Sequence, residues 1–165
     1  MPYQMKVDGM AQISELLDQM DKAAPAAAAQ ALYDGAGLMA AEINQSAGQI
    51  KTAPFKYAKN GDSRLPSPEE KEIVMQAAAG IAKFDKNGVE VQTSVGFRNS
   101  GYATLNGKLK PVPQIVNAIN SGTSFMKKQP FVRKAANAGA PKAMAVMKAR
   151  IEEAFENISK QNGGK

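Results

Sequence analysis

The chain contains no cysteine, no histidine and no tryptophan among its 165 residues. Without cysteine, neither a disulfide nor a thiolate metal site can form. Histidine is the most frequent general base and metal ligand in proteins, so its absence excludes Ser-His-Asp and Cys-His catalysis and most zinc chemistry. The composition therefore argues against an enzyme, and we expect no catalytic, metal or cofactor site.

Aromatic residues and long apolar runs are also scarce. The chain has 6 Phe and 4 Tyr, and they are not interleaved with basic residues as in proteins that bind single-stranded nucleic acid. No apolar run approaches the roughly 20 residues that span a bilayer, and the N-terminus lacks the apolar region of a signal peptide. These features predict a soluble protein, present in the cytoplasm, with no membrane partner.

The positive charge is concentrated in one part of the sequence. Residues 1–96 carry 9 Lys and Arg against 12 Asp and Glu, a net charge of −3, whereas residues 97–165 carry 12 against 3, a net charge of +9. Such a split indicates that the C-terminal part faces something acidic. Nucleic acid, an acidic protein ring, the N-terminal part of a neighbouring subunit and plain solvent all remain open.

Apolar spacing predicts a strand and two helices in the N-terminal third. Alternating apolar and polar side chains predict a half-buried strand over residues 3–7. Helical spacing predicts a helix over residues 9–21 and, after a break at Pro25, an alanine-rich helix over residues 25–48. Gly35 and Gly37 weaken the second helix, so they indicate a kink or a close contact with a sheet or another subunit.

The middle of the chain alternates between loops and short elements. Residues 49–68 predict a long flexible loop, and Ser67 is the expected cap of a short helix that ends near Gln76. A β-hairpin is expected from 80–84 and 88–96, with its turn at Asp85-Lys86-Asn87-Gly88. Residues 98–113 predict a second long flexible loop.

The C-terminal part is expected to be helical. Residues 114–121 predict a short apolar helix, and a long helix begins near Pro130 with an interruption near 139–141 and a frayed end at 160–165. The expected fold class is α+β, in a single domain over residues 1–165. Its small antiparallel sheet, made of the N-terminal strand and the hairpin, packs against the long alanine-rich helix and the C-terminal helix.

Two short segments have the look of catalytic or metal sites, but their context points elsewhere. Gly61-Asp62-Ser63 is similar to an esterase nucleophile motif, yet no apolar strand precedes it and no histidine can accept the serine proton. The segment from Asp85 to Gly88 has oxygen ligands but lacks the spacing and the closing Glu of a calcium loop. We expect surface loop and hairpin turn, respectively.

Four basic residues, Lys127, Lys128, Arg133 and Lys134, surround a Pro-Phe pair near the C-terminal helix. A solvated turn and helix start would explain them, and so would a contact with an acidic partner subunit or with DNA. Basic residues alone give phosphate affinity without sequence preference. The interface reading thus stays open between protein and nucleic acid.

The same region carries the one family signature in the chain. A Gly-Thr-Ser turn precedes a basic spacer and a Pro-Phe-Val-Arg segment that opens a long helix. It resembles the signature of the tail-completion, or minor tail component, family of long-tailed phages, the minor tail protein Z-like group. The matched positions are Gly122, Thr123, Ser124, Pro130, Phe131 and Arg133.

The order of the expected elements is similar to that family along most of the chain. The similarity includes Val7-Asp8-Gly9, the paired leucines Leu16-Leu17, the alanine-rich helix, Lys51-Thr52-Ala53-Pro54 and the hairpin ending at Val95-Gly96. The chain departs from the family in three places. Residues 116–121 lack the usual aromatic-rich acidic run, the loop 55–72 is longer and adds a helix, and Lys134 stands where proline is usual.

The resemblance implies a virion structural protein at the head-proximal end of a phage tail, which completes the tail and allows head–tail joining as part of a ring. Its implied partners are the tail tube, the terminator, the head connector and further copies of itself, with contact to the DNA that passes through. The residues of the implied interface are Gly122, Thr123, Ser124, Lys127, Lys128, Pro130, Phe131 and Arg133. A tail terminator or a basic nucleic-acid-binding module is the alternative.

Overall fold

The computed structural model describes residues 10–57, 59, 61–82, 85–87, 90–97 and 101–162. Within these residues the chain is α+β, as the sequence predicted. The helices are α1 (Met10–Gly48), α2 (Pro68–Ala77), α3 (Val112–Ser121) and α4 (Phe131–Asn162). The strands are β1 (Ala79–Ile81), β2 (Asp85–Asn87), β3 (Glu90–Gln92), β4 (Val95–Phe97), β5 (Tyr102–Leu105) and β6 (Lys108–Pro111). The strand predicted over residues 3–7 lies outside the described residues.

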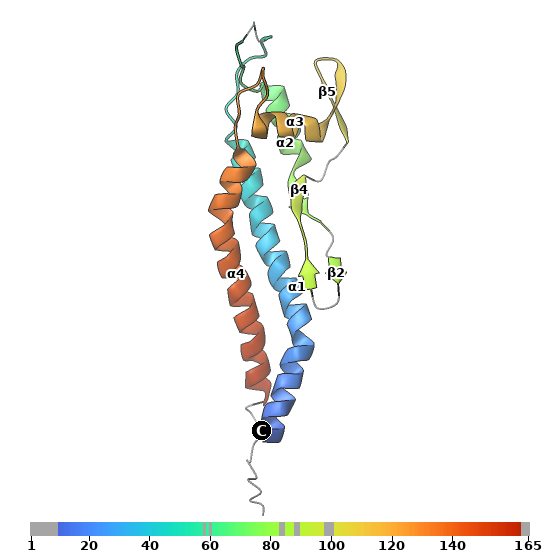
Figure 1. Cartoon of the computed structure of the whole chain (residues 1–165), viewed down its shortest axis with the longest axis vertical. Helices are drawn as coiled ribbons and strands as arrows, with labels where there is room; N and C mark the ends of the chain where they lie inside the picture. Colours follow the sequence, from blue (N-terminus) through green and yellow to red (C-terminus); the bar gives the residue numbers. More distant parts are fainter. Residues whose placement is uncertain are drawn as a thin grey trace, which may run out of the picture.

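Helices α1 and α4 lie side by side and antiparallel, and together they form a long rod that carries the other helices at one end (Figure 1). Small residues allow the two helices to approach closely. A Cβ atom added at Gly35 would lie 2.7 Å from Cγ of Met147, and one added at Gly139 would lie 2.8 Å from Sδ of Met39. The close contact predicted at Gly35 is therefore a contact with α4 of the same chain.

Helix α1 is continuous, so the predicted break at Pro25 is wrong. A proline inside a helix removes one backbone hydrogen bond and costs about 3 kcal/mol. Here it is followed by four alanines, the strongest helix formers, and the helix packs against α4. The predicted interruption near 139–141 is also wrong, because α4 runs through Pro141 without a break. Residues 160–162 are the last residues of α4.

The predicted hairpin is present beside α1, with its strands in two short pairs. Strands β1 and β4 pair antiparallel with Gly80 opposite Gly96, and β2 pairs with β3. The turn prediction was wrong in its position, because Asp85 and Asn87 are paired strand residues, opposite Gln92 and Glu90. The hairpin is fixed to α1 by Asn44, whose side-chain amide donates to the Ala79 carbonyl (3.2 Å) and accepts from the Ala79 N–H (2.6 Å).

Residues 102–111 form a second hairpin, so the loop predicted over 98–113 is wrong for this stretch. Strands β5 and β6 pair antiparallel, with Leu105 opposite Lys108. The two residues between them, Asn106 and Gly107, have φ angles of +51° and +72°. Positive φ at both central residues is the requirement of a type I′ turn, which an Asn-Gly pair meets well.

Helices α2 and α3 pack with the C-terminal part of α1 and the start of α4. Together they form the core of one end of the rod, which we call the head end of the molecule. The start of α2 agrees with the sequence: Ser67 is its cap, and the backbone N–H of Glu70 donates to the Ser67 hydroxyl at 3.1 Å. Helix α3 buries the apolar face that the sequence predicted. The core side chains from α2 and α3 are Ile73, Val74, Ala77, Val112, Ile115, Val116 and Ile119.

Candidate functional site

The Gly-Thr-Ser signature begins where α3 ends. Gly122 follows the last residue of α3 with a φ angle of +76°, and its N–H donates to the carbonyl of Ala118 at 3.0 Å. A Cβ atom at this position would lie only 2.9 Å from Cβ of Lys128. Both the backbone conformation and the close approach of the chain therefore require glycine here.

The next four residues close into a tight turn. Thr123 and Met126 exchange two backbone hydrogen bonds, of 3.0 Å and 3.3 Å. The turn is attached to the loop that precedes α2: the Arg64 N–H donates to the Phe125 carbonyl (2.9 Å), and the Lys127 N–H donates to the Arg64 carbonyl (2.8 Å). Ser124 and Phe125 are left exposed on the outside of the turn.

The loop over residues 49–68, predicted to be flexible, is joined to the signature at a second point. The side chain of Gln129 accepts a hydrogen bond from the Lys51 N–H (2.9 Å) and donates to the Lys51 carbonyl (2.8 Å). The Ala53 N–H donates to the Pro66 carbonyl at 3.0 Å, which closes the base of the loop. These bonds hold both ends of the loop within a single chain, without a neighbouring subunit.

The Pro-Phe-Val-Arg segment starts α4 and anchors it in the core. Phe131 is 3% exposed, and its ring packs edge-on to Phe97 with the ring centroids 6.0 Å apart. Its carbonyl accepts a hydrogen bond from the Ser46 hydroxyl at 2.9 Å. The side chain of Asn120 accepts from the Val132 N–H (3.2 Å), which satisfies one backbone donor at the start of the helix.

The four basic residues of the signature region are all exposed. Lys127 and Lys128 line a shallow hollow of about 460 Å³ together with Ser63. Arg133 and Lys134 are exposed on the first turn of α4 and do not line that hollow. The eight residues of the predicted interface thus separate into two groups. Gly122, Pro130 and Phe131 connect the head end to the rod, and the exposed residues are Thr123, Ser124, Lys127, Lys128 and Arg133.

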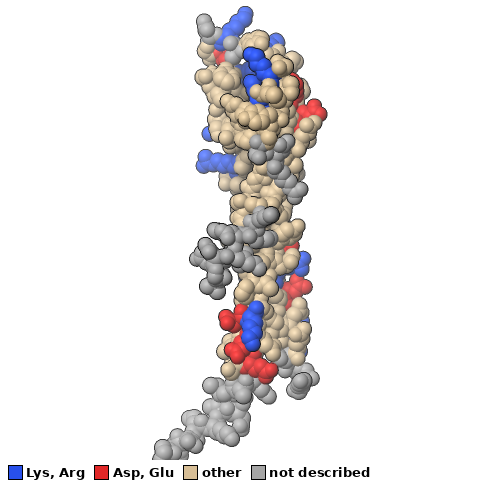
Figure 2. Space-filling view, turned by 90° about the vertical axis from the view of Figure 1, so that its right-hand side faces the viewer, with Lys and Arg blue, Asp and Glu red and all other residues tan. Residues whose placement is uncertain are grey.

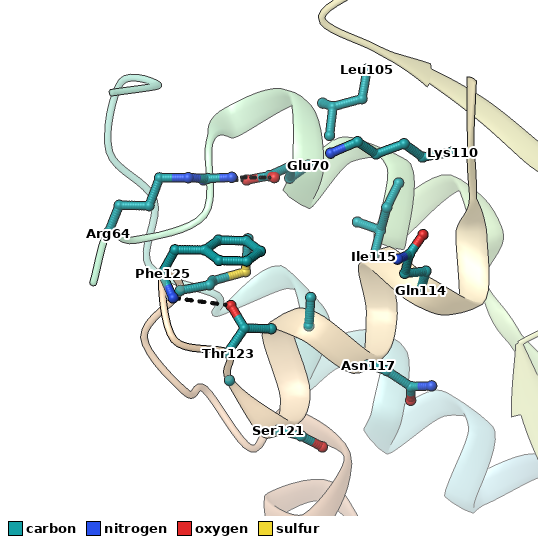
Figure 3. A pocket seen from close by; sticks show the side chains of 13 residues that line it. Arg64, Glu70, Leu105, Lys110, Gln114, Ile115, Asn117, Ser121, Thr123 and Phe125 are labelled. Carbon is teal, nitrogen blue, oxygen red and sulfur yellow. Dashed lines mark hydrogen bonds and ion pairs between the residues drawn. The ribbon is translucent and has the colours of Figure 1, made fainter. Parts of the chain in front are cut away.

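A larger cavity, of about 590 Å³, lies next to the turn and was not expected from the sequence (Figure 3). It lies between α3, the β5–β6 hairpin and the turn over residues 123–126. Its walls are mostly apolar, with Leu105, Ile115 and Phe125 among them, and Lys110 and Gln114 also line it. The half-exposed Phe125 adds an accessible aromatic ring.

One wall of this cavity holds an ion pair between Arg64 and Glu70. The two Arg64 Nη atoms each donate to one Glu70 carboxylate oxygen at 2.6 Å, and Phe55 lies under the guanidinium. Burial alone would raise the pKa of Glu70. The hydrogen bonds from Arg64 and the Ser67 N–H, together with the charges of Arg64 and Lys110, outweigh burial and lower that pKa. Apart from an acid in the first turn of α2, no pattern of residues indicates this pair.

Charge is distributed along the length of the molecule rather than between the two sequence halves. The acidic N-terminal and basic C-terminal parts meet in the rod, where Lys142 pairs with Glu42 (2.5 Å) and Arg150 with Asp34 (2.6 Å). Figure 2 shows mainly basic side chains with a few acidic ones at the head end, and acidic side chains around a basic one at the opposite end, which we call the foot. Part of the opposite charge of the two sequence halves is therefore paired within one chain.

Comparison with protein-family models, with curated proteins and with solved structures found no match to this chain. Within the described residues, no group of three or more Asp and Glu side chains is arranged to hold a metal ion. In the same residues, no helix is both long enough and apolar enough to cross a bilayer. Function is therefore inferred from the residues themselves and from their geometry.

Proposed function

We propose that this chain is a structural protein of a phage virion, located at the head-proximal end of the tail. It completes the tail and allows the tail to join the filled head, as one subunit of a ring that assembles in the host cytoplasm. Its partners are the tail tube, the terminator, the head connector and further copies of itself. It catalyses no reaction, and the head end contacts DNA only as the DNA passes.

The observation that carries this proposal is the signature between α3 and α4. Six positions resemble the signature of the tail-completion family: Gly122, Thr123, Ser124, Pro130, Phe131 and Arg133. In this chain the structure explains two of these residues: Gly122 has a positive φ angle, and the ring of Phe131 is buried. The signature therefore forms the connection between the head end of this molecule and its helical rod, which is a structural role and not a catalytic one.

The shape and the charge of the molecule are consistent with a subunit of an assembly. The rod has a mainly basic head end and a foot of mixed charge, so its two ends are unlike. A contact between unlike ends leaves each subunit free to bind a further one. Such heterologous contacts produce a closed ring when the rotation between subunits closes.

The test is electron microscopy of particles made by the parent phage or prophage with this gene disrupted. DNA-filled heads beside separate tails of normal length are the expected result. Tails of uncontrolled length would instead assign the chain as a terminator. Normal infectious particles would refute a role in the virion and would favour the nucleic-acid-binding alternative, which predicts duplex binding that weakens steeply with salt.

A further inference from the structure

The cavity beside the signature has the properties of a docking site for an apolar side chain with acidic neighbours. Its volume of about 590 Å³ falls in the range of about 300–1,000 Å³ that is usual for binding sites. Its apolar walls include Leu105 and Ile115, which are buried, and Phe125, which is 51% exposed. The Phe125 ring is therefore the apolar group at the cavity that a docked side chain would remove from water.

The surroundings of the cavity are positively charged. Lys110 lines it, Lys108 lines an adjoining hollow with Phe125, and Lys127 and Lys128 line another. The acid in the cavity wall, Glu70, is already neutralised by Arg64. Among the described residues, the four lysines form no ion pair with an acid. Whatever docks here is therefore expected to carry negative charge near an apolar group.

The foot of the same molecule has this complementary pattern. Ile13 and Leu17 are four residues apart, so they lie on one face of α1, and they are 54% and 60% exposed. Glu15, Asp18 and Asp21 accompany them on the same helix, and in the described part of the chain none of these acids is in an ion pair. The start of α1 lies at the far end of the rod from the cavity (Figure 1).

We propose that the foot of α1 from one copy docks into the cavity at the head of a second copy. Ile13 and Leu17 enter between α3 and the β5–β6 hairpin, and Asp18 and Asp21 meet Lys110 and Lys128. Because the two surfaces lie at opposite ends of a rod, one chain cannot bring its own foot to its own head. The contact is therefore intermolecular, and it repeats from copy to copy.

This contact would be the subunit interface of the proposed ring, and to that extent it rests on the proposed function. It also explains two exposed features that the fold does not use. Phe125 at the cavity and Ile13 and Leu17 at the foot expose apolar surface that the fold of one chain leaves uncovered. Each covers the other when the molecules associate head to foot.

The experiment is disulfide cross-linking of the purified full chain, which has no cysteine of its own. Asn117→Cys places a thiol at the cavity, and Ser14→Cys places one beside Ile13 and Leu17 without removing either. Two such single variants, one carrying a mass tag, are mixed and oxidised. The expected product is the mixed dimer of Asn117→Cys with Ser14→Cys. Ala145→Cys, exposed on α4 in the middle of the rod, is the matched control.

Charge reversal then tests which residues make the contact. Lys110→Glu with Lys128→Glu on the head copy, or Asp18→Lys with Asp21→Lys on the foot copy, should each lower the yield of mixed dimer about tenfold, because attractive pairs become repulsive. Combining the two reversed copies should restore the yield. Circular dichroism of each variant verifies the fold, and Lys110→Gln with Lys128→Gln provides a milder second variant.

Several results would overturn the proposal. Head–head or foot–foot dimers in equal yield would show random collision, as would equal yield from Ala145→Cys. An unchanged yield of mixed dimer after charge reversal would show that the reversed residues do not make the contact. Duplex DNA binding that needs Lys110 and Lys128, without any mixed dimer, would make the head a phosphate-binding surface. If cross-linking fails while gene disruption still yields filled heads and free tails, the contact is wrong and the proposed function stands.

Discussion

Both terminal nitrogens of Arg64 lie 2.6 Å from the two carboxylate oxygens of Glu70, so the two side chains form a bidentate pair. The Glu70 side chain is 3% exposed and that of Arg64 13%. Glu70 also accepts from the Ser67 N–H at 2.8 Å, and the backbone of Arg64 bonds to Phe125 and Lys127. The pair thus ties together the loop over 49–68, the start of α2 and the signature turn.

Replacing Glu70 by alanine should destabilise the protein by about 3 kcal/mol, because it leaves the Arg64 charge buried without a partner and removes half of the cap of α2. Glu69→Ala is the matched control, since Glu69 is exposed in the same turn of the helix; it should change the free energy of unfolding by no more than about 0.5 kcal/mol. Urea denaturation measures both. Equal effects for the two variants would contradict a structural role for the pair.

The lowered pKa of Glu70 predicts an acid-dependent loss of stability. Because the pKa is lower in the folded chain than its ordinary value of 4.5, the unfolded chain binds the proton more readily. The contribution of Glu70 is therefore complete above pH 4.5 and is lost as the pH falls below that value through the folded pKa. Melting temperatures of the wild type and Glu70→Gln, measured from neutral pH downward, should converge below this pH; a gap that stays constant would count against the prediction.

Gly122 and Gly61 separate backbone strain from steric overlap. Both have positive φ angles, +76° and +84°, but only Gly122 has a neighbour where a Cβ would lie, 2.9 Å from Lys128. Gly61→Ala should cost about 1 kcal/mol from the backbone alone, and Gly122→Ala should cost about 1–3 kcal/mol more from overlap. Thermal unfolding of both variants gives the comparison. If Gly61→Ala proved as costly as Gly122→Ala, the close approach at Lys128 would carry no weight.

Two helical glycines should respond to alanine in opposite directions. At Gly37 a Cβ would lie 3.8 Å from Cδ1 of Ile81, an ordinary contact, so Gly37→Ala should stabilise the protein by about 0.5–1 kcal/mol. At Gly139 it would lie 2.8 Å from Sδ of Met39 and 3.2 Å from Cγ of Glu42. Overlap there should outweigh the helical gain, with a net loss of about 1 kcal/mol. The free energies of unfolding are measured by chemical denaturation. If both variants proved more stable than the wild type, α1 and α4 would be able to separate freely.

Much of the fold follows from local sequence, and the errors have physical causes. The cap of α2 and the apolar face of α3 were predicted because each depends on a few adjacent residues. The β5–β6 hairpin was missed although Asn106-Gly107 satisfies the same Asn-Gly rule that was applied at Asn87-Gly88. Its strands carry exposed Lys108 and Lys110 and lack the strong apolar alternation that usually accompanies that turn.

The long helices and the ion pair depend on contacts that sequence patterns do not contain. Proline normally ends a helix, but Pro25 and Pro141 lie in helices that are held by packing along the whole rod. Glu70 is an acid in the first turn of α2, and nothing in its spacing indicates that Arg64 returns to meet it. Tertiary contacts decide both cases.

Phe131 and Arg133 lie two residues apart in the signature, and they should affect the protein in different ways. Phe131 is 3% exposed and packs on Phe97, so Phe131→Ala should cost about 3–5 kcal/mol of stability. Arg133 is exposed, and Arg133→Ala should leave stability within about 0.5 kcal/mol. Urea denaturation measures the stability of both variants. Supplying each variant to the gene-disrupted phage and counting the joined particles measures how well it joins heads to tails. If Arg133 contacts a partner, its variant folds normally but joins fewer heads to tails; normal joining would leave the signature with a structural role alone.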